Sequence, residues 1–134
     1  MTDLEKVQED GYALCNIENQ TPELCLVAVK QNGNALAYVK NQTTEICLEA
    51  IKQHTYSLKY IENQTHELCL TAVKQDGFAL QYIKKQTPET CIAAVNQCYI
   101  VERYVDPDFK FLFKDEFKDL SLDEIKAKVP ELFL

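Results

Sequence analysis

Residues 42–53 read QTTEICLEAIKQ, and close variants of this phrase occur three more times in the chain. The other copies are QTPELCLVAVKQ at 20–31, QTHELCLTAVKQ at 64–75 and QTPETCIAAVNQ at 86–97. Each copy begins 22 residues after the one before it. Repetition at a fixed short period is the signature of a stacked repeat array, so this phrase decides the fold class.

The repeated phrase predicts a short amphipathic helix. A threonine opens each copy, and its hydroxyl can accept a hydrogen bond from an otherwise unpaired backbone N–H group. Pro22 and Pro88 follow at the first helical position, where proline loses no hydrogen bond. Glu45 near the start and Lys52 near the end suit the two ends of the helix dipole. The apolar residues between them have helical spacing.

A second short helix is predicted after each copy, from the pattern G-x-A-L-x-Y-(V/I). In the unit that starts at residue 34, four residues are expected to face the core: Ala35, Leu36, Tyr38 and Val39. We expect Gly33 and Gly77 to end the preceding helix in the left-handed conformation. One continuous helix with an 11-residue period is the competing interpretation, and the recurring proline and glycine argue against it.

Neither helix is long enough to be stable alone, because isolated helices shorter than ~12 residues are marginal in water. Neighbouring units must therefore stack and bury each other's apolar faces. We predict an all-α fold, a short-repeat α-solenoid of helix–turn–helix units over residues 1–105 with an N-terminal cap at 2–10. Residues 106–134 leave the register and are predicted to form a helical C-terminal capping extension.

The C-terminal extension has an apolar face with two interpretations. Five residues recur on one predicted helical face: Phe109, Leu112, Phe113, Phe117 and Leu120. Ser121-Leu-Asp-Glu124 is a capping-box pattern and predicts a short final helix that stops before Pro130. The first interpretation is that the face covers the last repeat, because uncovered apolar faces this large are rare on monomers. Docking of another protein or a second copy is the alternative.

Four of the six cysteines occupy the same position of successive copies: Cys25, Cys47, Cys69 and Cys91. Stacked helices lie ~8–10 Å apart, which exceeds the ~4.4–6.8 Å Cα separation of a disulfide. We predict buried, reduced thiols here, and leave the pairing of Cys15 and Cys98 open. Reduced thiols and a polar start without a secretory pattern favour an intracellular protein. No apolar run approaches the ~20 residues of a membrane-spanning helix.

The formal net charge of −7 is unevenly distributed. Residues 1–31 carry −4, residues 32–105 carry 0 and residues 106–134 carry −3. A neutral array with acidic ends argues against a nucleic-acid partner. A ladder of Lys30, Lys52 and Lys74 nevertheless keeps nucleic-acid binding as the alternative function.

No catalytic constellation is present, since the chain has neither a phosphate-binding glycine loop nor an H-E-x-x-H site. His54 and His66 occupy non-equivalent turn positions, and no C-x-x-C spacing supports zinc. We predict a non-catalytic protein with no cofactor and no metal. A thiol or zinc function is the weakest hypothesis.

Positions that vary between copies predict where a partner binds. One outer stripe of the second helix reads Tyr12-Cys15-Asn19, Asn34-Ala37-Asn41, Tyr56-Lys59-Asn63 and Phe78-Gln81-Lys85. A fixed frame with varied residues is how repeat scaffolds build binding surfaces, and aromatic residues often anchor interfaces. The candidate partner-binding residues are Tyr12, Tyr56, Lys59, Phe78 and Gln81. We therefore predict binding of a protein or peptide, self-association included; unselected surface variation is the alternative.

The segments TPELCLVAVKQNGNALAYVK (21–40) and THELCLTAVKQDGFALQYIKKQTPE (65–89) resemble a family of tandem short repeats known only as a domain of unknown function. Such repeats are abundant in proteins of giant viruses that infect amoebae. The resemblance covers about residues 7–105 and implies a viral or microbial intracellular repeat protein, in the host cytoplasm if viral. It supplies no catalytic residues, and residues 106–134 lie outside it.

Overall fold

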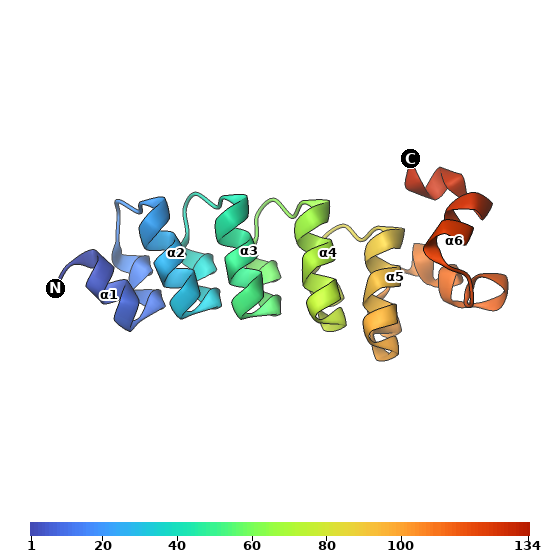
Figure 1. The fold of residues 1–134 in the computed structure, drawn as a ribbon, viewed down its shortest axis with the longest axis horizontal. Coiled ribbons are helices and arrows are strands. Elements are labelled where there is room, and N and C mark those ends of the chain that lie inside the picture. The colour runs from blue at the N-terminus through green and yellow to red at the C-terminus, as the bar shows by residue number, and fades with distance from the viewer. The chain divides into compact units, whose positions relative to one another are not determined.

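The computed structural model describes residues 1–134 and is all-α, with no strands (Figure 1). Five α-helices alternate with 3₁₀ helices: α1 (Asp3–Glu9), η1 (Gly11–Asn16), α2 (Pro22–Gln31), η2 (Gly33–Tyr38), α3 (Thr44–Gln53), η3 (Thr55–Tyr60), α4 (His66–Gln75), η4 (Gly77–Tyr82), α5 (Pro88–Gln97) and η5 (Tyr99–Tyr104). The predicted helical repeat array is confirmed. The chain forms two compact units, residues 1–72 and 73–134. None of its helices has the length and apolar character needed to cross a bilayer.

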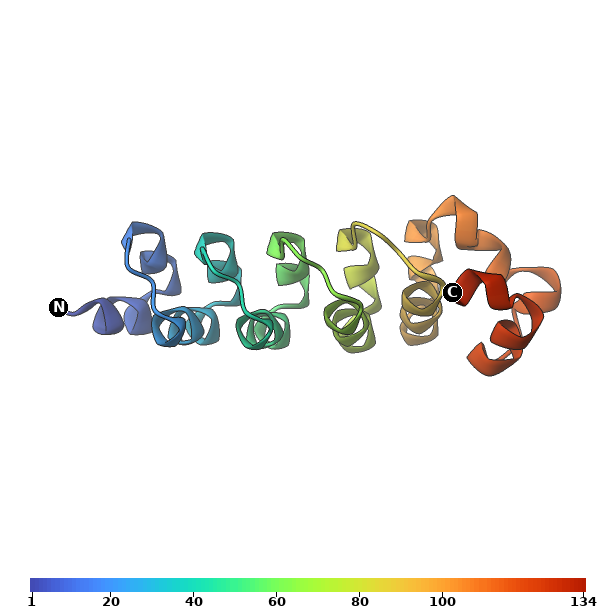
Figure 2. The same cartoon turned by 90° about the horizontal axis from the view of Figure 1, so that it is seen from above.

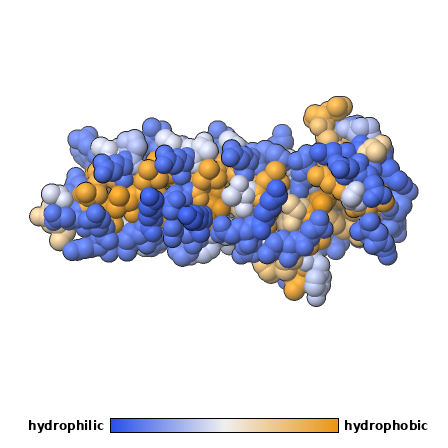
Figure 3. All heavy atoms as spheres, in the orientation of Figure 1, coloured by the Kyte–Doolittle hydropathy of each residue, from blue (hydrophilic) through white to orange (hydrophobic).

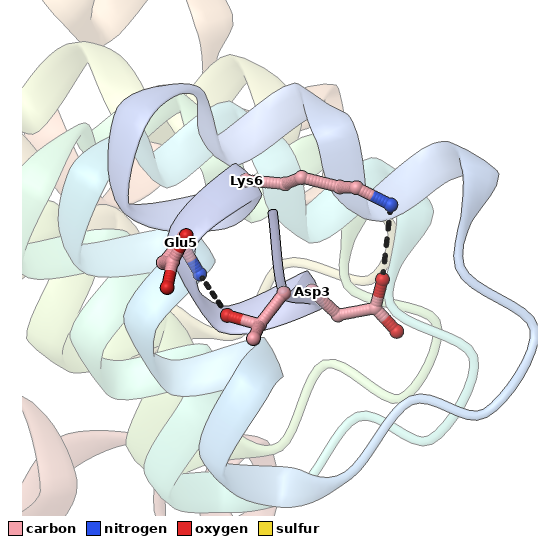
Figure 4. Close-up of polar contacts among 4 residues, drawn as sticks. Asp3, Glu5 and Lys6 are labelled. Carbon is pink, nitrogen blue, oxygen red and sulfur yellow. Dashed lines mark hydrogen bonds and ion pairs between the residues drawn. The ribbon is translucent and has the colours of Figure 1, made fainter.

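Threonine caps start the α-helices, as predicted. At α1, the Thr2 hydroxyl accepts a hydrogen bond from the N–H of Glu5 at 3.1 Å, and Lys6 forms an ion pair with Asp3 at 3.4 Å (Figure 4). The threonines before α2, α3 and α5 accept equivalent bonds at 3.2–3.3 Å. Because both members of the Lys6–Asp3 pair are about half-exposed, the hydroxyl caps contribute more to these helix starts than the ion pair does.

The second helix of every 22-residue repeat is a six-residue 3₁₀ helix. Its three-residue turn places Gly33, Leu36 and Val39 on one buried face. Ala35 is also buried, but Tyr38 is 43% exposed, so the prediction that Tyr38 faces the core is wrong. Tyr38 is the last residue of η2 and lays its ring at the surface instead of between the helices.

Glycine has a different role from the one predicted. No glycine has a positive φ, and α2 ends at Asn32 in an extended conformation (φ −152°, ψ 112°). A Cβ atom on Gly33 would lie 2.8 Å from the carbonyl oxygen of Ala50, and one on Gly77 would lie 2.6 Å from that of Ala94. At Gly33 and Gly77, glycine therefore permits a close approach to the backbone of the next α-helix and does not serve a left-handed conformation.

In the first unit, α1, α2 and α3 stand side by side and the 3₁₀ helices form a second row (Figures 1 and 2). Small and medium apolar residues fill the space between them, among them Val7, Leu14, Ala28, Val29, Leu36, Ala50 and Ile51. Over this unit, hydrophobic residues show only as patches between hydrophilic ones (Figure 3). The four cysteines that recur in the repeated phrase are buried, and none forms a disulfide, which confirms that prediction: Cys25, Cys47, Cys69 and Cys91.

In the second unit, the C-terminal extension covers the last repeat. Leu112 of η6 (Pro107–Phe113) and Ile125 of α6 (Leu122–Lys128) form a core with Ile92 of α5. Partly buried residues surround this core: Phe109, Phe113, Phe117, Leu120, Leu122, Val129, Leu132 and Phe133. The apolar face of the extension therefore packs on α5 of the last repeat.

The extension is built from short pieces. The predicted helical face of Phe109 to Leu120 is divided between two 3₁₀ helices, η6 and η7 (Asp115–Phe117), because Asp115 adopts a positive φ of 52° at the start of η7. The Ser121 and Glu124 capping box is present, and α6 ends at Lys128 as predicted. A last 3₁₀ helix, η8 (Pro130–Phe133), follows.

Candidate functional site

Exposed aromatic side chains gather on the 3₁₀ helices of the first unit. Tyr12, Tyr38 and Tyr56 are 39%, 43% and 40% exposed. The ring of Tyr12 meets that of Tyr38 edge-on, with 5.9 Å between centroids. The Asn34 amide donates a hydrogen bond to the Tyr56 hydroxyl at 3.2 Å, and therefore links η2 to η3. These contacts join the three 3₁₀ helices into one surface.

Lys59 completes this surface. Its ammonium group lies 5.7 Å from the ring centre of Tyr56 and 5.0 Å from that of Tyr60, within the range of a cation–π interaction. Tyr56 and Lys59 are three residues apart, which is one turn of a 3₁₀ helix, so they share a face. We call the following residues the aromatic face: Tyr12, Asn34, Tyr38, Tyr56, Lys59 and Tyr60.

In η1 and η2, the residue before the 3₁₀ helix fixes the backbone of the variable position. The Asp10 carboxylate accepts a hydrogen bond from the N–H of Tyr12 at 2.9 Å, and the Asn32 amide oxygen accepts one from the N–H of Asn34 at 3.0 Å. In η3, His54 makes no such bond, but its ring stacks on Tyr56 with 5.3 Å between centroids. The varied side chains are therefore displayed from fixed backbone positions.

The remaining two predicted site residues lie in the second unit. Phe78 is 37% exposed and meets the ring of Tyr104 edge-on at 6.2 Å. Its N–H donates a hydrogen bond to Asp76 at 2.9 Å, which repeats the arrangement in η1. The Gln81 amide donates a hydrogen bond to the carbonyl oxygen of Phe78 at 3.1 Å. The structure thus groups Tyr12, Tyr56 and Lys59 in one unit, and Phe78 and Gln81 in the other.

Sequence reasoning missed the role of the glutamine that opens each repeated phrase. The amide nitrogen of Gln42 donates hydrogen bonds to the carbonyl oxygens of Leu36 at 3.3 Å and Tyr60 at 2.8 Å. Its amide oxygen accepts a hydrogen bond from the N–H of Glu62 at 3.0 Å. One side chain therefore ties the end of η2 to the end of η3 through main-chain atoms.

The same glutamine clamp occurs in other copies. Gln20 bonds the carbonyl oxygen of Tyr38 at 2.8 Å and the N–H of Lys40 at 2.9 Å. Gln86 bonds the carbonyl oxygen of Tyr104 at 2.8 Å and the N–H of Asp106 at 2.7 Å. The recurrence of glutamine at the start of every repeated phrase could have indicated this role, because a freely solvated position tolerates other polar residues.

The loops that the clamps fix border cavities in the first unit that are partly open to solvent. One cavity of about 200 Å³ lies between the loops after η2 and η3, with polar residues of both loops at its edge. Ile61, Leu68 and Cys47 supply its apolar lining. A smaller cavity of about 90 Å³ lies one copy earlier, beside Cys25. The cavities therefore recur with the repeat.

The buried cysteines are unsuited to nucleophilic chemistry. Burial raises the pKa of the Cys25, Cys47 and Cys69 thiols, and raises that of Cys91 to about 12. These groups therefore stay protonated at neutral pH, whereas a reactive cysteine needs its thiolate. No group of three or more histidine, cysteine, aspartate or glutamate side chains is arranged to hold a metal ion.

Residues 21–64 match the family profile of a domain of unknown function (DUF4116), a span that contains α2, η2, α3 and η3. Comparison with curated proteins and with solved structures found no significant match.

Proposed function

We propose that this protein is a non-catalytic repeat scaffold that binds a protein or peptide partner through the aromatic face. The observation that carries the proposal is that tyrosine rings on three successive 3₁₀ helices are exposed and yet held by defined contacts. Tyrosine offers a large amphipathic contact area with few rotatable bonds, and fixed rings lose little freedom on binding.

The charge of the first unit indicates which partner suits it. Residues 1–72 carry 5 lysines and 10 acidic residues, a net charge of −5. Tyr12 and Tyr38 contact each other rather than a cation, so their ring faces can receive a basic side chain. A neutral or basic partner segment is therefore favoured over an acidic one, and a second copy of the acidic chain is a less suitable occupant.

The setting of the protein belongs to the same proposal. Repeats like these are abundant in giant viruses of amoebae, which supports a viral protein that acts in the host cytoplasm. The unpaired buried cysteines fit such a reducing compartment.

The test is a pull-down from the lysate of the native host, with partners identified by mass spectrometry. The intact chain is compared with a Tyr12→Ala/Tyr56→Ala double variant, with Phe78→Ala, and with Tyr99→Ala as a control aromatic residue that is 78% exposed outside the aromatic face. Circular dichroism first establishes that each variant keeps its helices. We expect a protein partner that Tyr99→Ala retains and the double variant loses. A partner that all variants retain would exclude the aromatic face.

Nucleic-acid binding is the alternative function. Lys30, Lys52 and Lys74 are exposed in the last turns of α2, α3 and α4. This hypothesis predicts recovery that nuclease abolishes and affinity that falls steeply with salt. The net charge of −5 over residues 1–72 weighs against it.

A further inference from the structure

The tripeptide Asn-Gln-Thr ends three successive turns of the first unit, at 19–21, 41–43 and 63–65. Two of its three residues have structural roles. The glutamine clamps main-chain atoms, and the threonine caps the next α-helix. The recurrence of glutamine and threonine is therefore explained by the fold itself.

The asparagine has no comparable role. Asn19, Asn41 and Asn63 are exposed, and none of their side chains makes a hydrogen bond within the chain. None has the positive φ that would favour asparagine over other residues. In the fourth copy Lys85 occupies this position while Gln86 still clamps and Thr87 still caps. The fold therefore keeps its glutamine and threonine without the asparagine.

We propose that Asn19, Asn41 and Asn63 bind the main chain of an extended basic peptide that crosses the loops of the first unit. A primary amide has one carbonyl acceptor and an NH₂ donor. It can therefore pair with the N–H and C=O groups that an extended peptide leaves free. This surface is distinct from the aromatic face, so either can fail without the other.

The spacing of the repeat fits such a peptide. Packed helices lie ~8–10 Å apart, so equivalent asparagines of adjacent copies are expected at that separation. A polyproline II chain rises ~3.1 Å per residue and completes a turn in three residues, about 9.3 Å. Successive asparagines can therefore meet every third residue of the peptide in the same orientation.

The larger cavity supplies a place for one side chain of that peptide. Asn41 and Asn63 both line it, and Ile61 and Leu68 provide apolar walls of the kind that pack along the stem of a lysine or arginine. The Glu62 side chain, also in the lining, is exposed and makes no ion pair, so its carboxylate can receive the cationic head.

Lys40, the cation in the lining of the cavity, is already engaged. The Lys40 ammonium group donates a hydrogen bond to the carbonyl oxygen of Glu18 at 3.1 Å, on the side of the preceding loop. Together with the net charge of −5 over residues 1–72, this arrangement favours a basic peptide over an acidic one.

The experiment uses the full chain and a phage-displayed library of random linear twelve-residue peptides. Synthetic versions of the selected peptides are then titrated by fluorescence polarisation. We expect selection of sequences with lysine or arginine, and loss of affinity of about fivefold to tenfold for each of Asn41→Ala and Asn63→Ala. Asn96→Ala, which removes an exposed asparagine from α5, is the control and should bind as the unaltered chain does.

Two further measurements identify the contacts. Methylation of single peptide nitrogens should weaken binding at positions three residues apart, because it removes the N–H groups that would donate to the asparagine carbonyl oxygens. Glu62→Gln should weaken the preference for a basic residue. The melting temperature of Asn41→Ala should match that of the unaltered chain, since the side chain has no partner to lose.

A library that yields no binder, or peptides whose affinity the Asn41→Ala/Asn63→Ala double variant leaves unchanged, would overturn the proposal. Peptides lost only with Tyr12→Ala/Tyr56→Ala would also overturn it, and would support the aromatic face instead. Loss in the asparagine variants alone would support the asparagine site without the aromatic face.

Discussion

The repeats and the C-terminal extension are held together in different ways. In the repeats, a glutamine side chain bonds main-chain atoms at the end of the following 3₁₀ helix, and the same buried positions recur in successive copies, as at Leu36, Leu58 and Leu80. In the extension, large apolar side chains surround Leu112 and Ile125, and the joint occurs once. A contact that must be reused depends on the backbone, which every copy shares. A contact made once can be shaped by bulky side chains.

The largest loss of stability is expected at the single joint. Leu112→Ala should lower the free energy of unfolding by about 2 to 5 kcal/mol, because the side chain is fully buried and its removal leaves a cavity. Urea denaturation followed by circular dichroism measures the change, with exposed Tyr99→Ala as the control. Equal losses in the two variants would mean that the extension does not pack on α5.

The reused joint is tested by Gln42→Leu, which keeps the size of the side chain and removes its hydrogen bonds. We expect a loss of about 1 to 3 kcal/mol, because part-buried main-chain groups at Leu36 and Tyr60 lose their partner. Gln53→Leu is the matched control, since Gln53 bonds only the side chain of Glu49 within its own helix. If both substitutions had the same small effect, the clamp would be incidental to the array.

Gly33→Val tests the close approach between copies. The added atoms collide with the carbonyl oxygen of Ala50, so we expect a loss of about 1 to 3 kcal/mol, more than for Asn34→Ala. Thr55 stands at the equivalent position of the next copy, which places the expected loss toward the lower end. Comparison of thermal midpoints measures it, and equal shifts for Gly33→Val and Asn34→Ala would contradict the predicted collision.

Ser57→Ala is expected to stabilise the protein by about 1 kcal/mol. Ser57 is fully buried, and its hydroxyl has no hydrogen-bonding partner. Alanine occupies the same position in other copies, at Ala35 and Ala79. A higher denaturation midpoint would show that alanine, the residue in other copies, is the more stable choice at position 57. A lower one would mean that the hydroxyl has a partner, such as an ordered water molecule.

The smallest effect on stability at neutral pH is expected at Cys91. The effect of its raised pKa on the free energy of unfolding should become measurable only at alkaline pH. Burial raises its pKa from 9.0 to about 12 in the folded chain. The unfolded thiol releases its proton first, so the stabilising contribution is complete below about pH 9 and is lost as the pH rises toward 12. The free energy of unfolding should therefore fall less from pH 8 to pH 11 in the Cys91→Ala variant than in the unaltered chain. Parallel denaturation curves at the two pH values would decide this.

The sequence predicted the features that depend on the period. The threonine caps, the buried cysteines and the two-helix unit all follow from a position that recurs every 22 residues. The 3₁₀ form of the second helix was missed because six residues do not separate a period of three from one of 3.6. The spacing of Gly33, Leu36 and Val39 at intervals of three was the available indication.

The parts of the site that were missed depend on contacts between copies. Variation between repeats indicated Tyr12, Tyr56 and Phe78, which are exposed. Tyr38 was assigned to the core because it follows the core-facing Ala35 by three residues, and pattern alone does not show that its ring would meet that of Tyr12. A glutamine in a turn likewise resembles ordinary polar surface until the carbonyl group at the end of the following 3₁₀ helix is placed beside it.

The glutamine clamp also allows one copy of the repeat to be exchanged for another. The shortest hydrogen bonds of Gln20, Gln42 and Gln86 join main-chain atoms at or just after the end of the following 3₁₀ helix, so this part of the joint does not depend on which side chains that helix carries. A duplicated copy would enter the chain with its connection already specified, and a deleted copy would leave the connection intact. The length of the array, and the set of residues it displays, can therefore change by whole repeats in a single genetic event.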